Sequence, residues 1–256
     1  MISSNSNPRV KEIAGLNTSS KLRREKKLFV TEGEKMFIEA PKELIEEVYV
    51  TEDYLKDCPL EAKKKLEEKG FETVSEGVFN KMSDTKTPQG VLCVLRQEDK
   101  REEEILEGIG EEARILLLEG IQDPGNLGTM IRSCEGAGFE LVIADNKTAD
   151  LYNPKVVRAT MGSIFRVKVL YCEELLKMID KLKEKEVRVY AAHLKGEISY
   201  RDEDYGKKTA FLIGNEGKGL SPEATARADK LLKIPMKGRV ESLNAAVAAA
   251  ILMYNL

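Results

Sequence analysis

Hydrophobic and polar positions alternate regularly through the second half of the chain. Short apolar runs of strand length are each followed by a longer segment whose apolar residues recur with helical spacing. Strands are predicted at Arg114–Glu119, Leu141–Ala144, Val167–Leu170, Val187–Ala192, Ala210–Ile213 and Leu231–Ile234, and the clearest helices at Glu173–Glu184 and Leu243–Tyr254. Strands separated by helices of this length predict a mostly parallel sheet with helices on both faces.

The first part of the chain has a less regular pattern. Helices are expected near residues 8–26, 33–40 and 59–69, and strands at Leu28–Val30, Glu47–Thr51 and Gly90–Leu95. This alternation is typical of a small α/β domain. The almost wholly charged run Gln97–Glu104 resembles a linker. The predicted division is therefore a first domain at 1–96, a charged linker at 97–113 and a second domain at 114–256.

The composition narrows the class of protein. With 256 residues, 42% of them hydrophobic and 33% charged, the chain is typical of a globular protein. No apolar run approaches the roughly 20 residues that span a bilayer, and the polar start has no signal-peptide core, so we expect the cytoplasm. The four cysteines form no Cys-x-x-Cys pair, which argues against a zinc site or a disulfide framework. The single histidine, His193, lies in an apolar run and is interpreted as structural.

Charge is unevenly distributed. The net charge of −3 argues against a protein that coats nucleic acid. Residues 1–30, however, hold seven basic and two acidic side chains, a local excess of five positive charges. Two interpretations stay open: a solvated basic face, or an arm that contacts phosphate through Arg23, Arg24 and Lys26.

Three segments follow predicted strands and precede predicted helices, where open α/β proteins bind ligands. They are Asn126–Arg132, Gly214–Leu220 and Ile234–Asn244. The second has three glycines in six residues, which permit unusual backbone angles and close approach of a ligand. Its spacing matches neither the dinucleotide fingerprint nor the Walker loop. After it, Ser221 is expected to cap a helix with Pro222 at the first position.

The other two segments predict local structure in the same way. Ser242 is expected to cap the alanine-rich C-terminal helix, and Asp123–Asn126 is expected to be a turn before a helix that begins at Thr129. Arg132 then lies at the start of that helix. On the sequence alone, a surface or salt-bridging arginine is the favoured interpretation of Arg132.

Together the three segments resemble the motifs of the SpoU (TrmH-like) family of S-adenosylmethionine-dependent RNA 2′-O-ribose methyltransferases, in the SPOUT superfamily. The resemblance covers Arg114 to the C-terminus. It implies S-adenosylmethionine as cofactor, no required metal, and a homodimer in which each active site borrows from its neighbour. It also implies a deep trefoil knot, which the alternation of strands and helices does not suggest because knots are nearly absent elsewhere.

The resemblance also implies roles for particular residues. Arg132 would be the key catalytic residue. Side chains that orient it, the ribose or the methyl donor would be Asn126, Glu216, Ser242 and Asn244. The cofactor pocket would be lined by Gly214, Gly217, Gly219, Ile234, Met236 and Leu243. Because a guanidinium is a poor general base, Arg132 could instead stabilise the developing alkoxide and clamp a phosphate; both roles stay open.

The N-terminal part resembles, less specifically, the substrate-binding domain of rRNA-directed members of the family. Phe29–Glu34 and Met82–Gly90 carry this resemblance. The stretch Asn153–Ser163 also resembles a family segment, and its Lys155 and Arg158 are spaced for phosphate contact, although a solvated helix is an equal interpretation. These features favour rRNA as substrate. The alternatives are a tRNA ribose methyltransferase, a non-catalytic RNA-binding protein on the same fold, or a dinucleotide-dependent oxidoreductase, whose fingerprint is missing.

Overall fold

The computed structural model describes residues 1–256, which divide into two units. Unit 1 comprises Met1–Glu98 and Asp150–Phe165, and unit 2 comprises Asp99–Ala149 and Arg166–Leu256. Asp150–Phe165 was expected within the second domain but belongs to unit 1, so the chain passes between the units three times. A cut at 97–113 would separate Asp150–Phe165 from the rest of unit 1. A domain boundary near 97–113 therefore stays a prediction. None of the helices has the length and apolar character needed to cross a membrane.

Unit 2 is built on a sheet of seven strands. Its strands are β5 (Ala113–Glu119), β6 (Leu141–Asp145), β7 (Lys168–Cys172), β8 (Arg188–Ala192), β9 (Ile198–Ser199), β10 (Lys208–Gly214) and β11 (Lys230–Lys233). Its helices are α7 (Glu102–Glu107), α8 (Pro124–Gly136), α10 (Leu175–Glu184), α11 (Pro222–Arg227) and α12 (Ala245–Met253). The spatial order is β7-β6-β5-β10-β8-β11-β9, and every pairing is parallel. The predicted parallel sheet is therefore confirmed.

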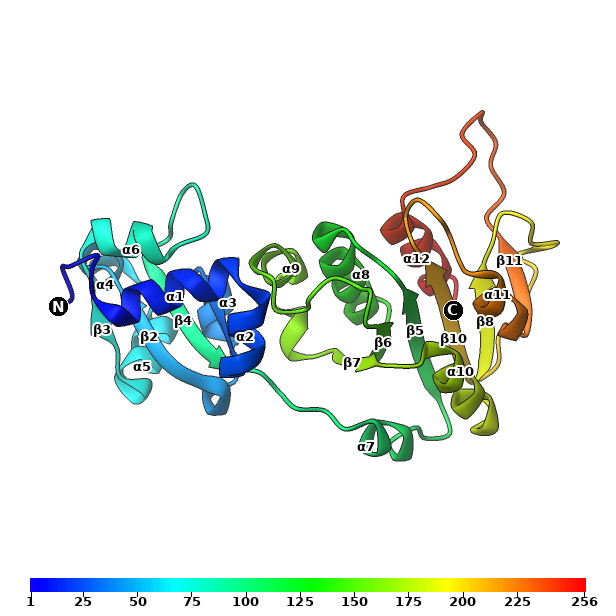
Figure 1. Cartoon of the computed structure of the whole chain (residues 1–256), viewed down its shortest axis with the longest axis horizontal. Coiled ribbons are helices and arrows are strands. Elements are labelled where there is room, and N and C mark those ends of the chain that lie inside the picture. The colour runs from blue at the N-terminus through cyan, green and yellow to red at the C-terminus, as the bar shows by residue number, and fades with distance from the viewer. The chain divides into compact units, whose positions relative to one another are not determined.

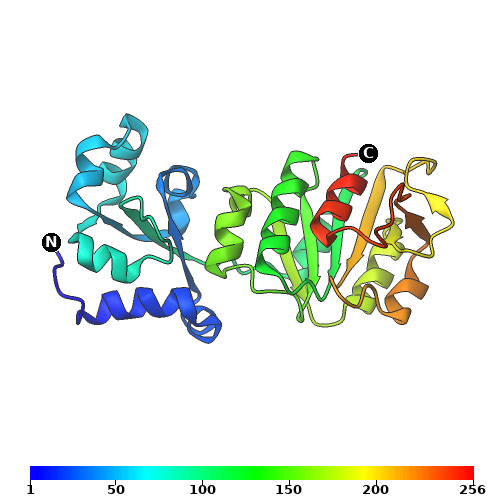
Figure 2. The same cartoon turned by 90° about the horizontal axis from the view of Figure 1, so that it is seen from above.

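Successive side chains of the central strands point to opposite faces, and helices cover both. Ile115 and Leu117 of β5 lie in a buried cluster with Met178 and Leu182 of α10. The short α7 packs on the same cluster through its partly buried apolar residues. On the other face, α8 and α12 lie against each other (Figures 1 and 2). Because all strands run the same way, their carboxyl ends bring successive loops to one edge, which is where the site lies.

Unit 1 holds a smaller, mixed sheet in the order β1-β4-β2-β3. Its strands are β1 (Leu28–Glu32), β2 (Ile45–Val50), β3 (Glu72–Thr73) and β4 (Val91–Arg96). Its helices are α1 (Pro8–Thr18), α2 (Ser20–Lys26), α3 (Glu34–Glu39), α4 (Glu52–Asp57), α5 (Leu60–Lys69), α6 (Glu76–Met82) and α9 (Pro154–Thr160), with short 3-10 turns at Lys42–Leu44 and Ser163–Phe165. One core cluster joins α1 and α6 to the sheet, and α3 packs with α5.

Several predicted boundaries were wrong for identifiable reasons. The helix expected at 8–26 breaks at Ser19, whose extended backbone and side chain cap α2 through the Leu22 amide. The charged linker contains α7, whose first turn holds three glutamates that favour a helix N-terminus. Ser221 and Pro222 begin α11 as predicted.

Candidate active site

The three polar segments meet at the carboxyl edge of the unit 2 sheet. The Glu216 carboxylate accepts hydrogen bonds from the backbone amides of Gln122 and Asp123, both at 3.1 Å, and from Asn126 Nδ2 at 3.0 Å. Asn126 Oδ1 in turn accepts from Asn244 Nδ2 at 2.9 Å. We call Asn126, Glu216 and Asn244 the edge network. It joins one residue from each of the three segments, although Asn126 lies 90 residues before Glu216 and 118 before Asn244.

Helix caps place two members of the edge network. Asp123, rather than a free turn, caps α8 by accepting from the Asn126 amide at 2.9 Å, with Pro124 at the first position. Asn126 therefore lies in the first turn of α8. Asn244 caps α12 by accepting from the amides of Ala246 at 2.9 Å and Val247 at 3.3 Å. The predicted cap at Ser242 was wrong, because the N-cap is the residue directly before the first helical residue and α12 begins at Ala245.

Glu216 is held in its charged form. Partial burial raises the pKa of its carboxyl, but hydrogen bonds from Asn126 Nδ2 and from backbone amides outweigh burial and leave the pKa below its ordinary value. A carboxylate that already accepts these bonds is a poor base. Glu216 therefore fastens the loop before α8 to the glycine-rich loop after β10.

The glycine-rich loop closes on itself. Asn215 and Gly219 exchange backbone hydrogen bonds of 3.1 and 2.9 Å, and Asn215 Oδ1 accepts from the amides of Gly217 and Lys218, both at 3.0 Å. A Cβ on Gly214 would lie 2.3 Å from the carbonyl carbon of Gly219, and Gly219 has φ of +69°. The close approach at Gly214 is thus made by the loop's own backbone. Gly217 has neither constraint.

Sequence reasoning missed several residues that hold this edge. The Glu119 carboxylate accepts from the amide of Ser221 at 2.8 Å and from the hydroxyl of Ser221 at 2.6 Å. Asp145 accepts from the Gly120 amide at 2.9 Å, and Asn215 Nδ2 donates to the Gly120 carbonyl at 2.7 Å. A usable signal was present. Each is the first polar side chain at or just past the end of an apolar strand run, at the edge where ligands bind.

The remaining predicted catalytic residues stay outside the edge network. Arg132 is exposed on α8 and makes no hydrogen bond or ion pair. Six residues of helix place it about 9 Å further along the axis than Asn126. Ser242 is exposed and also makes no hydrogen bond, while the three apolar residues assigned to the pocket are half-buried: Ile234, Met236 and Leu243.

The predicted RNA contacts of unit 1 differ sharply in environment. Arg23 is buried and ion-paired with Asp150 at 2.7 Å, so its assignment as a phosphate contact was wrong. Lys26 pairs with Glu12 at 3.0 Å and Arg158 with Asp84 at 2.6 Å. Arg24 is exposed and has no partner, and Lys155 is exposed.

The other candidate chemistry has structural explanations. His193 Nδ1 accepts from the Lys195 amide at 3.1 Å in the turn after β8. The four cysteines are free thiols, and burial raises the pKa of Cys93 to about 12 and of Cys172 to about 11. A hollow of about 450 Å³ includes Arg188 at the start of β8, the opposite edge of the sheet from the edge network. Its Lys183 and Lys230 are already paired with carboxylates.

With its parallel α/β unit and its smaller unit with a mixed sheet, the chain resembles solved methyltransferases in fold. The sequence profile of the SpoU rRNA Methylase family matches residues 113–254, and that of the MRM3-like substrate binding domain matches residues 7–93. The chain belongs to the SpoU rRNA Methylase family.

Individual relatives extend over the whole chain. The 23S rRNA (guanosine(2553)-2'-O)-methyltransferase RlmP of Bacillus subtilis is 34% identical, covering 100% of this chain and 98% of its own length. The AdoMet-bound rRNA methyltransferase from Sinorhizobium meliloti superposes with a TM-score of 0.86 at 31% identity, over 99% of this chain and 95% of that one. The SpoU methyltransferase AviRb from Streptomyces viridochromogenes, at 23% identity, has a TM-score of 0.86 over 97% of both chains and supports the fold alone.

Proposed function

We propose that the chain transfers a methyl group from S-adenosylmethionine to a ribose 2′-hydroxyl of rRNA. The observation that carries this proposal is the edge network, because it fastens together the three segments that define the family resemblance. The similarity to RlmP and to the AdoMet-bound rRNA methyltransferase supports the cofactor and the substrate class. A tRNA substrate is a weaker second candidate, because relatives named tRNA/rRNA methyltransferases match only 55% of this chain.

The cofactor would lie on the loops after β10 and β11. Ile234, Met236 and Leu243 are half-buried, so each leaves apolar surface available to a flat adenine ring. The loop Gly214–Gly219 offers backbone groups for its polar edges. Bound S-adenosylmethionine supplies a methyl group on a sulfonium sulfur.

Within the edge network, every side chain has a positioning role. Asn126 uses its Nδ2 for Glu216 and its Oδ1 for Asn244, so its amide is fixed in one orientation. Such preorganisation favours in-line attack by a held ribose oxygen. None of the three is free to take the hydroxyl proton. Arg132, with its five unpaired donors, is the residue left to bind the phosphate or stabilise the developing alkoxide.

A second copy of the chain would complete the site. Val247, Ile251 and Tyr254 lie on one face at helical spacing across α12 and its last turn, and Val247 and Tyr254 are 48% and 64% exposed. Covering this apolar stripe with the same stripe of a partner would form a homodimer, and would let the exposed Arg132 act in the partner's site. The proposal also includes the deep trefoil knot that the family resemblance implies for the second half of the chain.

Transfer of a labelled methyl group tests the proposal. The full chain is incubated with radiolabelled S-adenosylmethionine and either rRNA or tRNA that lacks the modification, and 2′-O-methyl sites are mapped. We expect one labelled ribose in rRNA, and calorimetric binding of S-adenosylhomocysteine but not NAD. Label on a base, label on tRNA alone, or binding of NAD would refute it.

A further inference from the structure

Three consecutive residues, Thr148, Ala149 and Asp150, stand where the chain leaves unit 2 for unit 1. Within unit 2, Thr148 Oγ1 accepts from the Ile121 amide at 3.2 Å, and the Ala149 amide donates to the Ile121 carbonyl at 2.7 Å. Ile121 is fully buried. Asp145 Oδ1 accepts from the Thr148 hydroxyl at 2.8 Å and amide at 3.0 Å. Ile121 is therefore held on both of its backbone polar groups.

The loop that contains Ile121 also holds the edge network. The Gly120 carbonyl accepts from Asn215, and the amides of Gln122 and Asp123 donate to Glu216. A displacement of Ile121 would therefore move the donors that fix Glu216, and through Glu216 the amide of Asn126.

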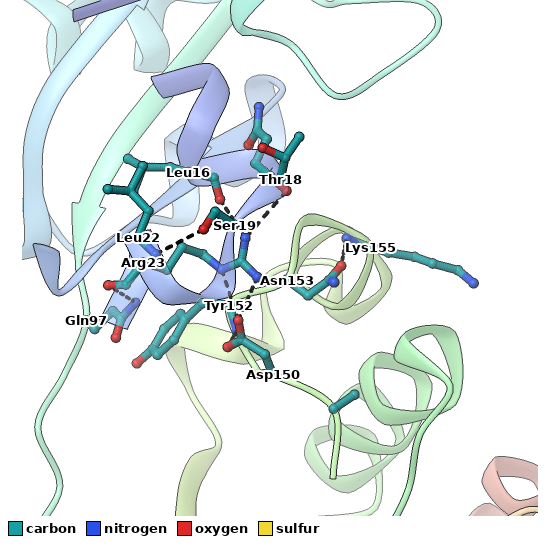
Figure 3. A network of polar contacts seen from close by, with 12 residues as sticks. Leu16, Thr18, Ser19, Leu22, Arg23, Gln97, Asp150, Tyr152, Asn153 and Lys155 are labelled. Atoms are coloured by element: carbon teal, nitrogen blue, oxygen red, sulfur yellow. Dashed lines mark hydrogen bonds and ion pairs between the residues drawn. The ribbon is translucent and has the colours of Figure 1, made fainter. Parts of the chain in front are cut away.

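On the other side, Asp150 is fixed within unit 1. Its Oδ2 accepts from Arg23 Nε at 2.9 Å and Nη2 at 2.7 Å, and its Oδ1 accepts from the Tyr152 amide at 3.0 Å (Figure 3). Arg23 Nη1 donates to the Leu16 carbonyl at 2.6 Å, which ties the pair to the end of α1. The Tyr152 ring lies 4.6 Å from the Phe29 ring.

We propose that Arg23 and Asp150 form a positioning pair for methyl transfer, on the assumption that the proposed function holds. The pair holds Asp150 within unit 1, the unit that contains the match to the substrate binding domain. Asp150 directly follows Ala149, which together with Thr148 holds the loop that contains Ile121. The Arg23 side chain is buried and that of Asp150 is 30% exposed, and an ion pair with a buried partner contributes little net stability against an apolar replacement, so specificity of position is the better explanation for it here. Arg23 acts through the chain and touches no substrate.

Asp150→Asn is the first variant, because it keeps the shape of the side chain and removes its charge. Asp150→Glu is the second: it keeps the ion pair, leaves no buried charge unpaired, and lengthens the connection by one methylene. The matched control is Glu47→Gln, which weakens the pair between Arg9 of α1 and Glu47 of β2 in the same unit, away from residues 148–150.

Two measurements report on the proposal. In hydrogen exchange of the free protein, the amides of residues 120–123 should exchange about tenfold faster in both Asp150 variants and remain unchanged in Glu47→Gln. In single-turnover methylation at saturating rRNA and cofactor, the Asp150 variants should be about tenfold slower, while the affinities for rRNA and S-adenosylhomocysteine stay within about twofold of the natural protein.

Unchanged exchange at residues 120–123 in Asp150→Glu would overturn the proposal, whatever the activity. So would a loss confined to rRNA affinity, since that would make Asp150 a binding residue. Exchange needs no substrate, so failure of the natural protein to methylate RNA would refute the proposed function without deciding this measurement.

Discussion

The carboxyl edge of unit 2 and the basic stretch of unit 1, within residues 1–30, were both assigned functions from the sequence, and the structure places their residues in very different surroundings. At the edge, Asn126, Glu216 and Asn244 come together from three distant segments. In the basic stretch, Arg23 is buried in an ion pair and Lys26 is paired, which leaves Arg24 exposed and unpaired.

The difference lies in the kind of signal. A polar residue in the loop or helix start that follows a parallel strand is brought to one edge of the sheet by topology, because parallel strands deliver their carboxyl ends to that edge. A local count of positive charges has no such geometric constraint. It cannot distinguish a cation that faces solvent from one that meets Glu12 or Asp150 after folding, and the meeting with Asp150 joins residues 127 positions apart.

The largest expected effect is at Arg132, where the rate of methyl transfer should change and the affinity for the cofactor should not. Arg132→Ala should slow single-turnover methyl transfer about 10²–10⁴-fold, the range for groups that assist proton transfer or stabilise developing charge. The affinity for S-adenosylhomocysteine should stay within about twofold, because Arg132 touches no part of the edge network. Arg132→Lys should also be impaired, since it loses the planar fork.

The control for Arg132 is Arg227→Ala, which removes an arginine of α11 that pairs with Asp180. It should leave both rate and affinity near those of the natural protein. A near-normal rate in Arg132→Ala would reduce Arg132 to a surface residue. Lost cofactor binding would mean that it supports the fold.

A smaller effect should separate two glycines of the same loop. Gly214→Ala places a Cβ 2.3 Å from the Gly219 backbone, so the loop must shift, which costs about 1–3 kcal/mol of unfolding free energy. Gly217→Ala meets nothing closer than 3.7 Å and should be nearly neutral. Chemical denaturation and titration with S-adenosylhomocysteine measure both. Equal effects in the two variants would contradict the structure of the loop.

The sequence predicted the framework of unit 2 well and its details unevenly. All six strands expected there are present, because buried parallel strands give short apolar runs and amphipathic helices give a distinct period. The two-residue β9 is too short for a pattern, and α4 and α6 of unit 1 are single-turn or two-turn helices that were missed for the same reason.

The candidate site was predicted in part. Asn126, Glu216 and Asn244 were named from motifs, but their contacts and caps required the fold. The cap of α12 was placed at Ser242 instead of Asn244 because Ser and Asn are both good capping residues, and α8 was expected to begin at Thr129 although it begins at Pro124. Arg23 was misassigned because its partner Asp150 is distant in sequence. Glu119, Asp145 and Asn215 were overlooked although each stands at a strand end, because their roles are hydrogen bonds to other loops that only the fold reveals.

The smallest expected effect tests what remains of the basic stretch. Arg24 is exposed on α2 without a partner, so a contact with an RNA phosphate would cost no existing ion pair. Arg24→Ala should weaken rRNA binding by a factor of about 1.4 to 5, since exposed charge pairs contribute roughly 0.2–1 kcal/mol. The slope of log affinity against log salt should fall in magnitude by about 0.7–0.9, the contribution of one phosphate contact.

Arg96→Ala, which removes a cation already paired with Glu46, is the control and should leave the salt slope unchanged. Binding measured at several salt concentrations separates the outcomes: an unchanged slope in Arg24→Ala would leave the basic stretch of unit 1 as a solvated face, and the RNA surface would have to be sought elsewhere in the chain.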